Sequence, residues 1–156
     1  MTADERFAQA ALELGHRFDG EIKIGGNYSP VVRDGQQLFV SGQIPRVGDE
    51  VLYVGTVGAG IDLASARTAA AICAIRALAF VQRAAGSLDA VRAVARITVY
   101  VRSAPDFTQQ SEVADGASDL IARVLGPVGA HTRTSVGVLQ LPKGAAVELD
   151  LIARVD

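Results

Sequence analysis

Apolar and polar residues alternate along the last part of the chain, and this alternation predicts two strands, over 132–139 and 147–155, joined by a turn at 141–144. The first strand carries Arg133 on the same side as small residues, and the second carries Glu148 on a polar side. We expect the two strands to be neighbours in one sheet. The sequence therefore predicts an arginine and a carboxylate on adjacent strands.

Apolar residues recur at helical spacing in three other segments, 3–18, 62–85 and 105–125. Asp62 is a typical residue before a helix, and Gly86 is a typical residue after one. The middle segment is rich in alanine, whose small side chain brings a helix close to its neighbour. We therefore expect the middle helix to pack closely on a sheet.

Three further segments have the composition of strands. Residues 31–42 predict a hairpin around the Asp34-Gly35 turn, 50–55 predict a short strand, and 94–102 predict a half-buried strand. The order of all elements predicts the α+β class, with a mixed sheet and two main helices on one face. Because Ile152 is apolar on the other face, we expect a homo-oligomer to cover that face, with ligand sites between subunits.

Composition narrows the function classes. The length of 156 residues predicts one domain, and 49% hydrophobic residues are typical of a globular chain. Cys73 is the only cysteine, so an internal disulfide and a cysteine metal cluster are excluded, and we expect this thiol to be buried. His16 and His131 stand alone. The sequence therefore predicts no metal site.

Charge and hydropathy point to the cytoplasm. A net charge of -2 and a pI of about 5.7, without a basic cluster, argue against binding to a nucleic-acid backbone. The weakly charged stretch 68–81 is interrupted by Arg76 and is too short to span a bilayer. Acidic residues at the N-terminus argue against a signal peptide. We expect a cytoplasmic protein with neither nucleic-acid nor membrane partners.

Arg133 is the first candidate functional residue. Its guanidinium would stand above Ser135 and Gly137, which leave room for a ligand, and its planar fork matches a carboxylate through two charge-assisted hydrogen bonds. A small anionic molecule would fit there. The alternative interpretation is that Arg133, Glu148 and Asp150 are ordinary solvated charges that pair across strands.

Several groups of residues, taken in order over 28–153, resemble the RidA (YjgF-like) family, trimers with a chorismate-mutase-like fold of the bacillary type. The pieces are Tyr28, Leu38–Pro45, Ile97–Val101, Asp106-Phe107, Arg133–Val138, Leu141–Lys143 and Val147–Ala153. Their order and spacing, rather than any single piece, carry the resemblance. The chain is most similar to a longer bacterial subgroup with an extra N-terminal helix, which here would occupy 1–20 of a single domain over 1–156.

The resemblance implies a function and roles for particular residues. Family members hydrolyse reactive enamines and imines, such as 2-iminobutanoate and 2-iminopropanoate, to 2-keto acids and ammonia without a cofactor. Arg133 corresponds to the arginine that would bind the substrate carboxylate. Glu148 corresponds to a glutamate that would orient water and move a proton, and Tyr28 to a tyrosine that would donate to the substrate. The carbonyl of Ser135 would help to hold the water.

The chain departs from the family pattern around the arginine. Ser111 stands where the deaminases often have asparagine, Ser135 replaces a common cysteine, and Gly137 replaces a common acidic residue. Gly42 is interpreted either as a close contact to the ligand or as a glycine at a strand end. Tyr28 is interpreted either as a site residue or as a loop tyrosine. These changes leave the identity of the substrate open.

Two functions follow as hypotheses. The first is a deaminase of small 2-imino acids that works in a cleft between subunits of a homotrimer. The alternative is a non-catalytic or regulatory homotrimer that binds a small carboxylate or keto acid in the same cleft. Some relatives are described as endoribonucleases (L-PSP), but the acidic chain argues against that activity here.

Overall fold

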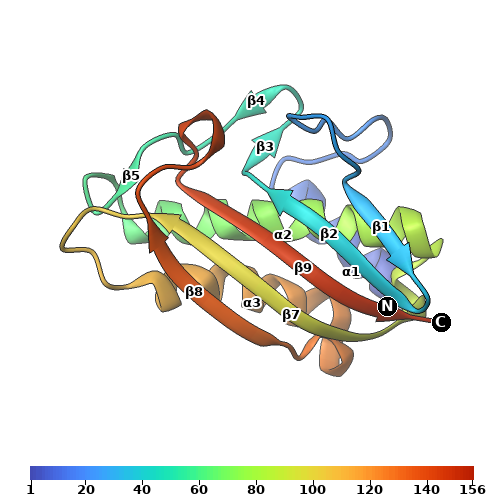
Figure 1. Ribbon diagram of the computed structural model, residues 1–156. Coiled ribbons are helices and arrows are strands. Elements are labelled where there is room, and N and C mark those ends of the chain that lie inside the picture. Colours follow the sequence, from blue (N-terminus) through green and yellow to red (C-terminus); the bar gives the residue numbers. More distant parts are fainter.

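A five-stranded mixed sheet forms the centre of the molecule, and helices cover one of its faces in the computed structural model, which describes residues 1–156 (Figure 1). The strands are β1 (Val31–Asp34), β2 (Gln37–Gln43), β7 (Val91–Arg102), β8 (Thr132–Val138) and β9 (Val147–Val155). Their spatial order is β1-β2-β9-β7-β8. All neighbours are antiparallel except β7 and β8, which run parallel. The predicted α+β class with a mixed sheet is confirmed.

The remaining strands are short and lie outside the main sheet. They form two pairs, β3 (Arg46–Val47) with β4 (Glu50–Val51) and β5 (Thr56–Val57) with β6 (Gly60–Ile61). The predicted strand over 50–55 is therefore wrong beyond Val51. Tyr53 has a left-handed φ of 56°, which breaks the extended backbone there.

One expectation about the main sheet is wrong. The strands β8 and β9 follow each other in the sequence, but β7 lies between them in space. The chain leaves β8 through the turn at Pro142–Gly144, passes over the end of the sheet, and returns on the far side of β7. Arg133 and Glu148 are consequently not on adjacent strands.

The helix α2 (Leu63–Ala85) is the central helix of the core and confirms the predicted segment. Asp62 accepts a hydrogen bond from the Ser65 amide at 2.8 Å, and Gly86 ends the helix with a left-handed φ of 85°. The helix is long and apolar enough to cross a membrane by length and composition, but 72% of its apolar window is buried inside the fold. It packs on β9 through the apolar side of that strand.

The helix α3 (Gln110–Leu125) packs beside α2 on the same face of the sheet (Figure 1). It starts later than predicted, because Pro105-Asp106 forms a turn instead of the first helical residues. Gly116 lies where α3 approaches α2, and a Cβ at this position would overlap the carbonyl of Arg67. The close approach of the two helices therefore requires glycine.

Gly116→Ala is expected to reduce the free energy of unfolding by about 1–3 kcal/mol, because main-chain atoms of α2 cannot rotate away from the added methyl group. This loss exceeds the gain of about 1 kcal/mol in helix propensity. Urea unfolding measures the difference. Gly20→Ala is the matched control, because a Cβ there meets nothing within 4 Å. An unchanged unfolding midpoint in Gly116→Ala would contradict the close approach.

The helix α1 (Ala3–Glu13) is shorter than the predicted 3–18, because the chain turns at Gly15, whose φ is 81°. It lies against α3, and Arg123 on α3 donates two hydrogen bonds to the Glu13 carboxylate at 2.7 and 2.9 Å. At the other end, Asp4 accepts a hydrogen bond from the Leu88 amide at 2.9 Å. The N-terminal helix therefore belongs to the helical layer.

His16 follows α1 and is buried, with 4% of its surface exposed, in a stack with the Phe18 ring at 4.9 Å. Its Nε2 atom has no hydrogen-bond partner. Burial, together with the nearby charge of Arg76, lowers the pKa of His16 from 6.5 to about 4. Because the unfolded chain takes up this proton first, the folded state loses stability as the pH falls from 6.5 towards 4.

His16→Phe is expected to remove this acid sensitivity, because phenylalanine keeps the stack without a titrating group. Between pH 7 and pH 4.5 the variant should lose about 2 to 3 kcal/mol less unfolding free energy than the wild type. Urea unfolding at the two pH values gives this comparison, in which the other titrating groups are common to both proteins. Equal losses would show that His16 is not buried in its neutral form.

Candidate functional site

A cavity of about 400 Å³ lies at one end of the sheet, between β2, β9, the loop before β1 and the turn after β8. Three of the predicted site residues line it: Tyr28, Gly42 and Glu148. Tyr28 comes from the loop and has 48% of its surface exposed. The register between β2 and β9 shifts between Val40 and Gln43, so the ladder is interrupted where Gly42 lies. This irregularity opens the wall of the cavity.

Glu148 lies directly over Gly42. A Cβ at position 42 would collide with the Glu148 carboxylate, so glycine is required for this approach. Burial raises the pKa of Glu148, and the neighbouring charge of Asp150 raises it further. Asp150 itself accepts a hydrogen bond from the Tyr100 hydroxyl at 3.0 Å. A carboxyl group with a raised pKa is suited to taking up and releasing a proton.

Arg76 forms a part of the cavity wall that the sequence did not predict. It comes from α2, is only 4% exposed, and donates to the carbonyls of Arg46 at 3.0 Å and Lys23 at 2.7 Å. Burial lowers its pKa to about 10. The sequence signal for this residue is a single arginine within an apolar, alanine-rich helix. That signal argues against a membrane span but does not by itself indicate a cavity.

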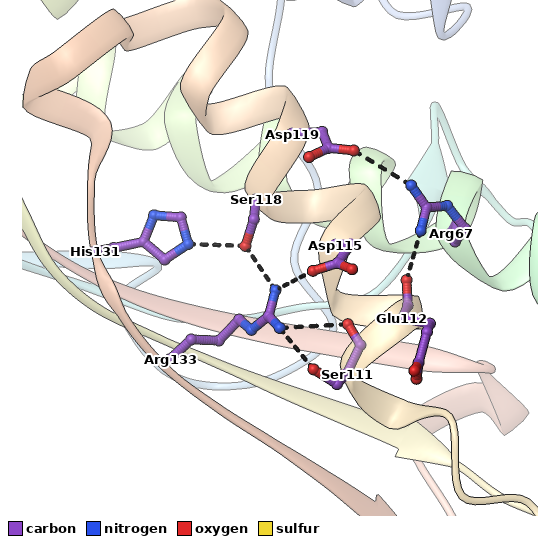
Figure 2. Close-up of polar contacts among 8 residues, drawn as sticks. All are labelled: Arg67, Ser111, Glu112, Asp115, Ser118, Asp119, His131 and Arg133. Atoms are coloured by element: carbon purple, nitrogen blue, oxygen red, sulfur yellow. Dashed lines mark hydrogen bonds and ion pairs between the residues drawn. The ribbon is translucent and has the colours of Figure 1, made fainter.

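Arg133 lies in a separate group of side chains on β8 and α3 (Figure 2). Its Nη1 donates to Asp115 at 2.8 Å and to the Ser118 hydroxyl at 3.0 Å, and its Nη2 donates to the Ser111 hydroxyl at 2.8 Å. His131 contacts the same Ser118 hydroxyl through Nε2 at 2.8 Å. Arg133 and Ser111 are therefore brought together, as the predicted substrate-binding group requires.

These contacts correct two expectations about Arg133. The space in front of its guanidinium is filled by α3, not open as the small residues of β8 suggested. The alternative of a cross-strand pair with Glu148 or Asp150 is also wrong, because the ion pair is with Asp115. Both errors have one cause, which is that β7 and α3 pack around β8.

Ser135 and Arg133 lie on the same face of β8. In the pairing with β7, Ser135 lies opposite Val99 and Arg133 lies opposite Ile97. Both of these β7 residues are buried under the helices. Glu148 lies opposite Tyr100, which belongs to the other face of the sheet. One chain therefore holds two separate groups. The cavity group comprises Tyr28, Gly42 and Glu148, and the arginine group comprises Arg133, Ser111 and Ser135.

Cys73 and the acidic residues do not suggest a bound metal. The Cys73 thiol is fully buried, lies 3.6 Å from the Val147 carbonyl, and has a pKa raised by burial. The predicted burial of this thiol is confirmed. No three His, Cys, Asp or Glu side chains gather in an arrangement that could hold a metal ion.

The chain is similar to known proteins in both sequence and structure. The family model described as "YjgF/chorismate mutase-like, putative endoribonuclease" matches residues 4–153. Protein TCP17 of Trypanosoma cruzi is 41% identical over 157 residues, which cover 100% of this chain and 98% of TCP17.

Two solved structures are similar over almost the whole chain. The protein Atu1372 of Agrobacterium tumefaciens, described as having unknown function, is 39% identical with a TM-score of 0.87, over 99% of this chain and 95% of that one. A protein of Shewanella oneidensis described as a "putative endoribonuclease" is 26% identical with a TM-score of 0.90, over 99% of this chain and 100% of that one.

Proposed function

Because this chain belongs to the YjgF (RidA) family, we propose that it hydrolyses reactive 2-imino acids to 2-keto acids and ammonia in a cleft between two subunits of a homotrimer. One observation carries the proposal. The chain holds all the predicted site residues, but in two groups on opposite faces of its sheet, so that a second copy is needed to bring them together. A cytoplasmic location is part of the proposal.

Arg133 supplies the binding step. A substrate carboxylate takes the fork of the guanidinium in place of Asp115, and the Ser118 and Ser111 hydroxyls keep the guanidinium in position. The Asp115 side chain is 47% exposed, and such a pair contributes only about 0.2–1 kcal/mol to stability. Replacing it with a substrate carboxylate is therefore energetically feasible.

Glu148 supplies the proton transfers. Water adds to the imine carbon while Glu148 accepts one of its protons, and the imine nitrogen takes up a proton to become an amine. The carbinolamine then loses ammonia and leaves the 2-keto acid. A carboxylate whose pKa is raised by burial is a stronger base than an ordinary glutamate and can accept the proton and later return it. Tyr28, at the mouth of the cavity, donates to the substrate.

The alternative is a non-catalytic homotrimer that binds a small carboxylate or keto acid. The internal pairing of Arg133 with Asp115 does not distinguish this alternative from the deaminase, because both require Arg133 to release Asp115 before it binds a carboxylate. We do not propose the endoribonuclease activity of the relatives' description, because the net charge of -2 disfavours binding along a nucleic-acid backbone. An assay for RNA cleavage tests this.

The deciding experiment measures 2-keto acid release from imino acids generated in situ by an amino acid oxidase, with semicarbazide as a competing trap. Faster release with the wild-type protein than without it supports the deaminase. Identical traces over a broad panel of amino acids, combined with saturable binding of keto acids, would favour the non-catalytic trimer. Light scattering at micromolar concentration tests the trimer separately, and a monomer would contradict the shared cleft.

A further inference from the structure

The cavity beside Glu148 is unusually basic for a chain of net charge -2. Glu148 is the only acidic residue in its lining, whereas the cationic residues there are Lys23, Arg46, Arg76 and Lys143. Lys23 is paired with Asp49 at 2.9 Å, outside the lining, and both side chains are more than half exposed. The other three cations have no carboxylate partner within the chain. The lining of the cavity therefore carries an excess of positive charge.

Arg76 is a buried cation with no carboxylate partner in the chain, and this is energetically unfavourable when no ligand is bound. Both of its terminal nitrogens donate to main-chain carbonyls, and its buried Nε has no partner. A buried guanidinium without a counter-charge is unfavourable, and an anion placed nearby offsets that cost. The burial of Arg76 and its unpartnered Nε are therefore a second sign, beside the basic lining, that an anion belongs there.

Arg46 and Lys143 provide groups that a ligand can reach. The Arg46 guanidinium makes no hydrogen bond or ion pair within the chain, and Arg46 lines the cavity. Its guanidinium is therefore free to contact a ligand. Lys143 adopts a left-handed φ of 60° in the turn after β8, a conformation that is strained for lysine and that holds it at the cavity lining.

We propose that the basic residues of this cavity bind a second carboxylate of the ligand, so that the preferred ligands are small dicarboxylic 2-imino and 2-keto acids. The inference rests on the proposed function for the first carboxylate, which Arg133 of another copy holds, while the second carboxylate contacts Arg46 and Lys143. Glu148, which lines the same cavity, then acts on the reacting carbon between the two carboxylates. A cavity of about 400 Å³ has room for a ligand of this size.

Calorimetry with stable product analogues tests this inference on the full-length protein. The two probes are 2-oxoglutarate and its 5-methyl ester, which share the same five-carbon acid chain. The ester replaces the second negative charge with a neutral methyl ester group. Wild-type protein should bind 2-oxoglutarate roughly tenfold or more tightly, as expected for one charge-assisted hydrogen bond. Arg46→Met should weaken this preference, because it removes one of the two cations that contact the second carboxylate and keeps the aliphatic stem and the carbonyl that Arg76 contacts.

Arg154→Met is the matched control, because Arg154 is an exposed arginine of β9 that does not line the cavity. It should leave the preference intact. Equal binding of the two probes by wild type, no binding of either, or an equal loss in Arg46→Met and Arg154→Met would overturn the inference. If Arg133→Ala keeps full turnover while the preference and its weakening in Arg46→Met persist, the inference stands and the proposed role of Arg133 fails.

Discussion

Replacing Arg133 with alanine is expected to reduce kcat/KM for 2-imino acids roughly 30-fold to several thousand-fold. Removing one partner of a charge-assisted pair costs about 2 to 5 kcal/mol, and the substrate carboxylate would lose both the charge and the fork that orients it. The measurement is 2-keto acid release in the presence of semicarbazide. Arg133→Lys should also be impaired, because a lysine cannot form the bidentate contact.

Arg67→Ala is the matched control for this loss. Arg67 on α2 also pairs with a carboxylate of α3, since its Nη2 lies 3.2 Å from Asp119, but it lies outside both groups of site residues (Figure 2). Circular dichroism shows whether each variant remains folded. Equal activity of wild type and a folded Arg133→Ala would exclude the proposed anchor, and equal losses in Arg133→Ala and Arg67→Ala would assign the effect to the packing of α3.

Mixing two inactive variants is expected to restore activity, which is the second large effect. Glu148→Gln removes proton transfer while keeping the shape of the side chain, and should reduce kcat roughly 10²–10⁴-fold. If each cleft takes Arg133 from one copy and Glu148 from the next, random mixing of Arg133→Ala with Glu148→Gln leaves about one quarter of the clefts intact. Activity should therefore rise from near zero to about one quarter of the wild-type value.

The control for the mixing experiment is a double variant that carries both changes. Mixed with Arg133→Ala, it supplies no intact Arg133, so no activity should return. Copies with distinguishable tags, captured together, show that subunits have exchanged. No recovery after proven exchange would mean that Arg133 and Glu148 must act within one chain, which would contradict the shared cleft.

Much of the fold was predictable because local signals agree with the tertiary structure. The alternation over 147–155 and the signals at Asp62 and Gly86 depend on neighbours in the sequence, and β9 and α2 occupy the predicted places. The boundaries were less reliable where a turn competes with a helix. The chain therefore leaves α1 before Gly15 and enters α3 only at Gln110.

The arrangement around Arg133 was not predictable from the same signals. Neighbouring positions in the sequence suggested that β8 and β9 are adjacent, but β8 joins the sheet through its parallel pairing with β7. Consecutive strands are neighbours in space only about two thirds of the time. The partnership with Asp115 and Ser118 depends on how α3 packs over β8, which the pattern of either segment does not specify.

The basic residues of the cavity were not predictable from the sequence, for a different reason. Arg46 in the short strand β3 and Lys143 in the turn after β8 have no sequence signal that connects them to a residue of α2. Arg76 is visible in the sequence as a charge in an apolar helix, but its consequence depends on the chain segments that fold against it. An arginine whose neighbours in a buried helix are all apolar must find polar partners elsewhere in the fold.

The two hydrogen bonds of Arg76 have a mechanical consequence for ligand binding. A single side chain of the core helix ties two segments of the cavity wall, at Lys23 and at Arg46 of β3, to the buried helix α2. Movement of either segment away from α2 breaks a hydrogen bond to the guanidinium, so that these segments keep little conformational entropy for a ligand to remove. Affinity at this part of the cavity is therefore governed more by the chemistry of its contacts than by the ordering of these two segments.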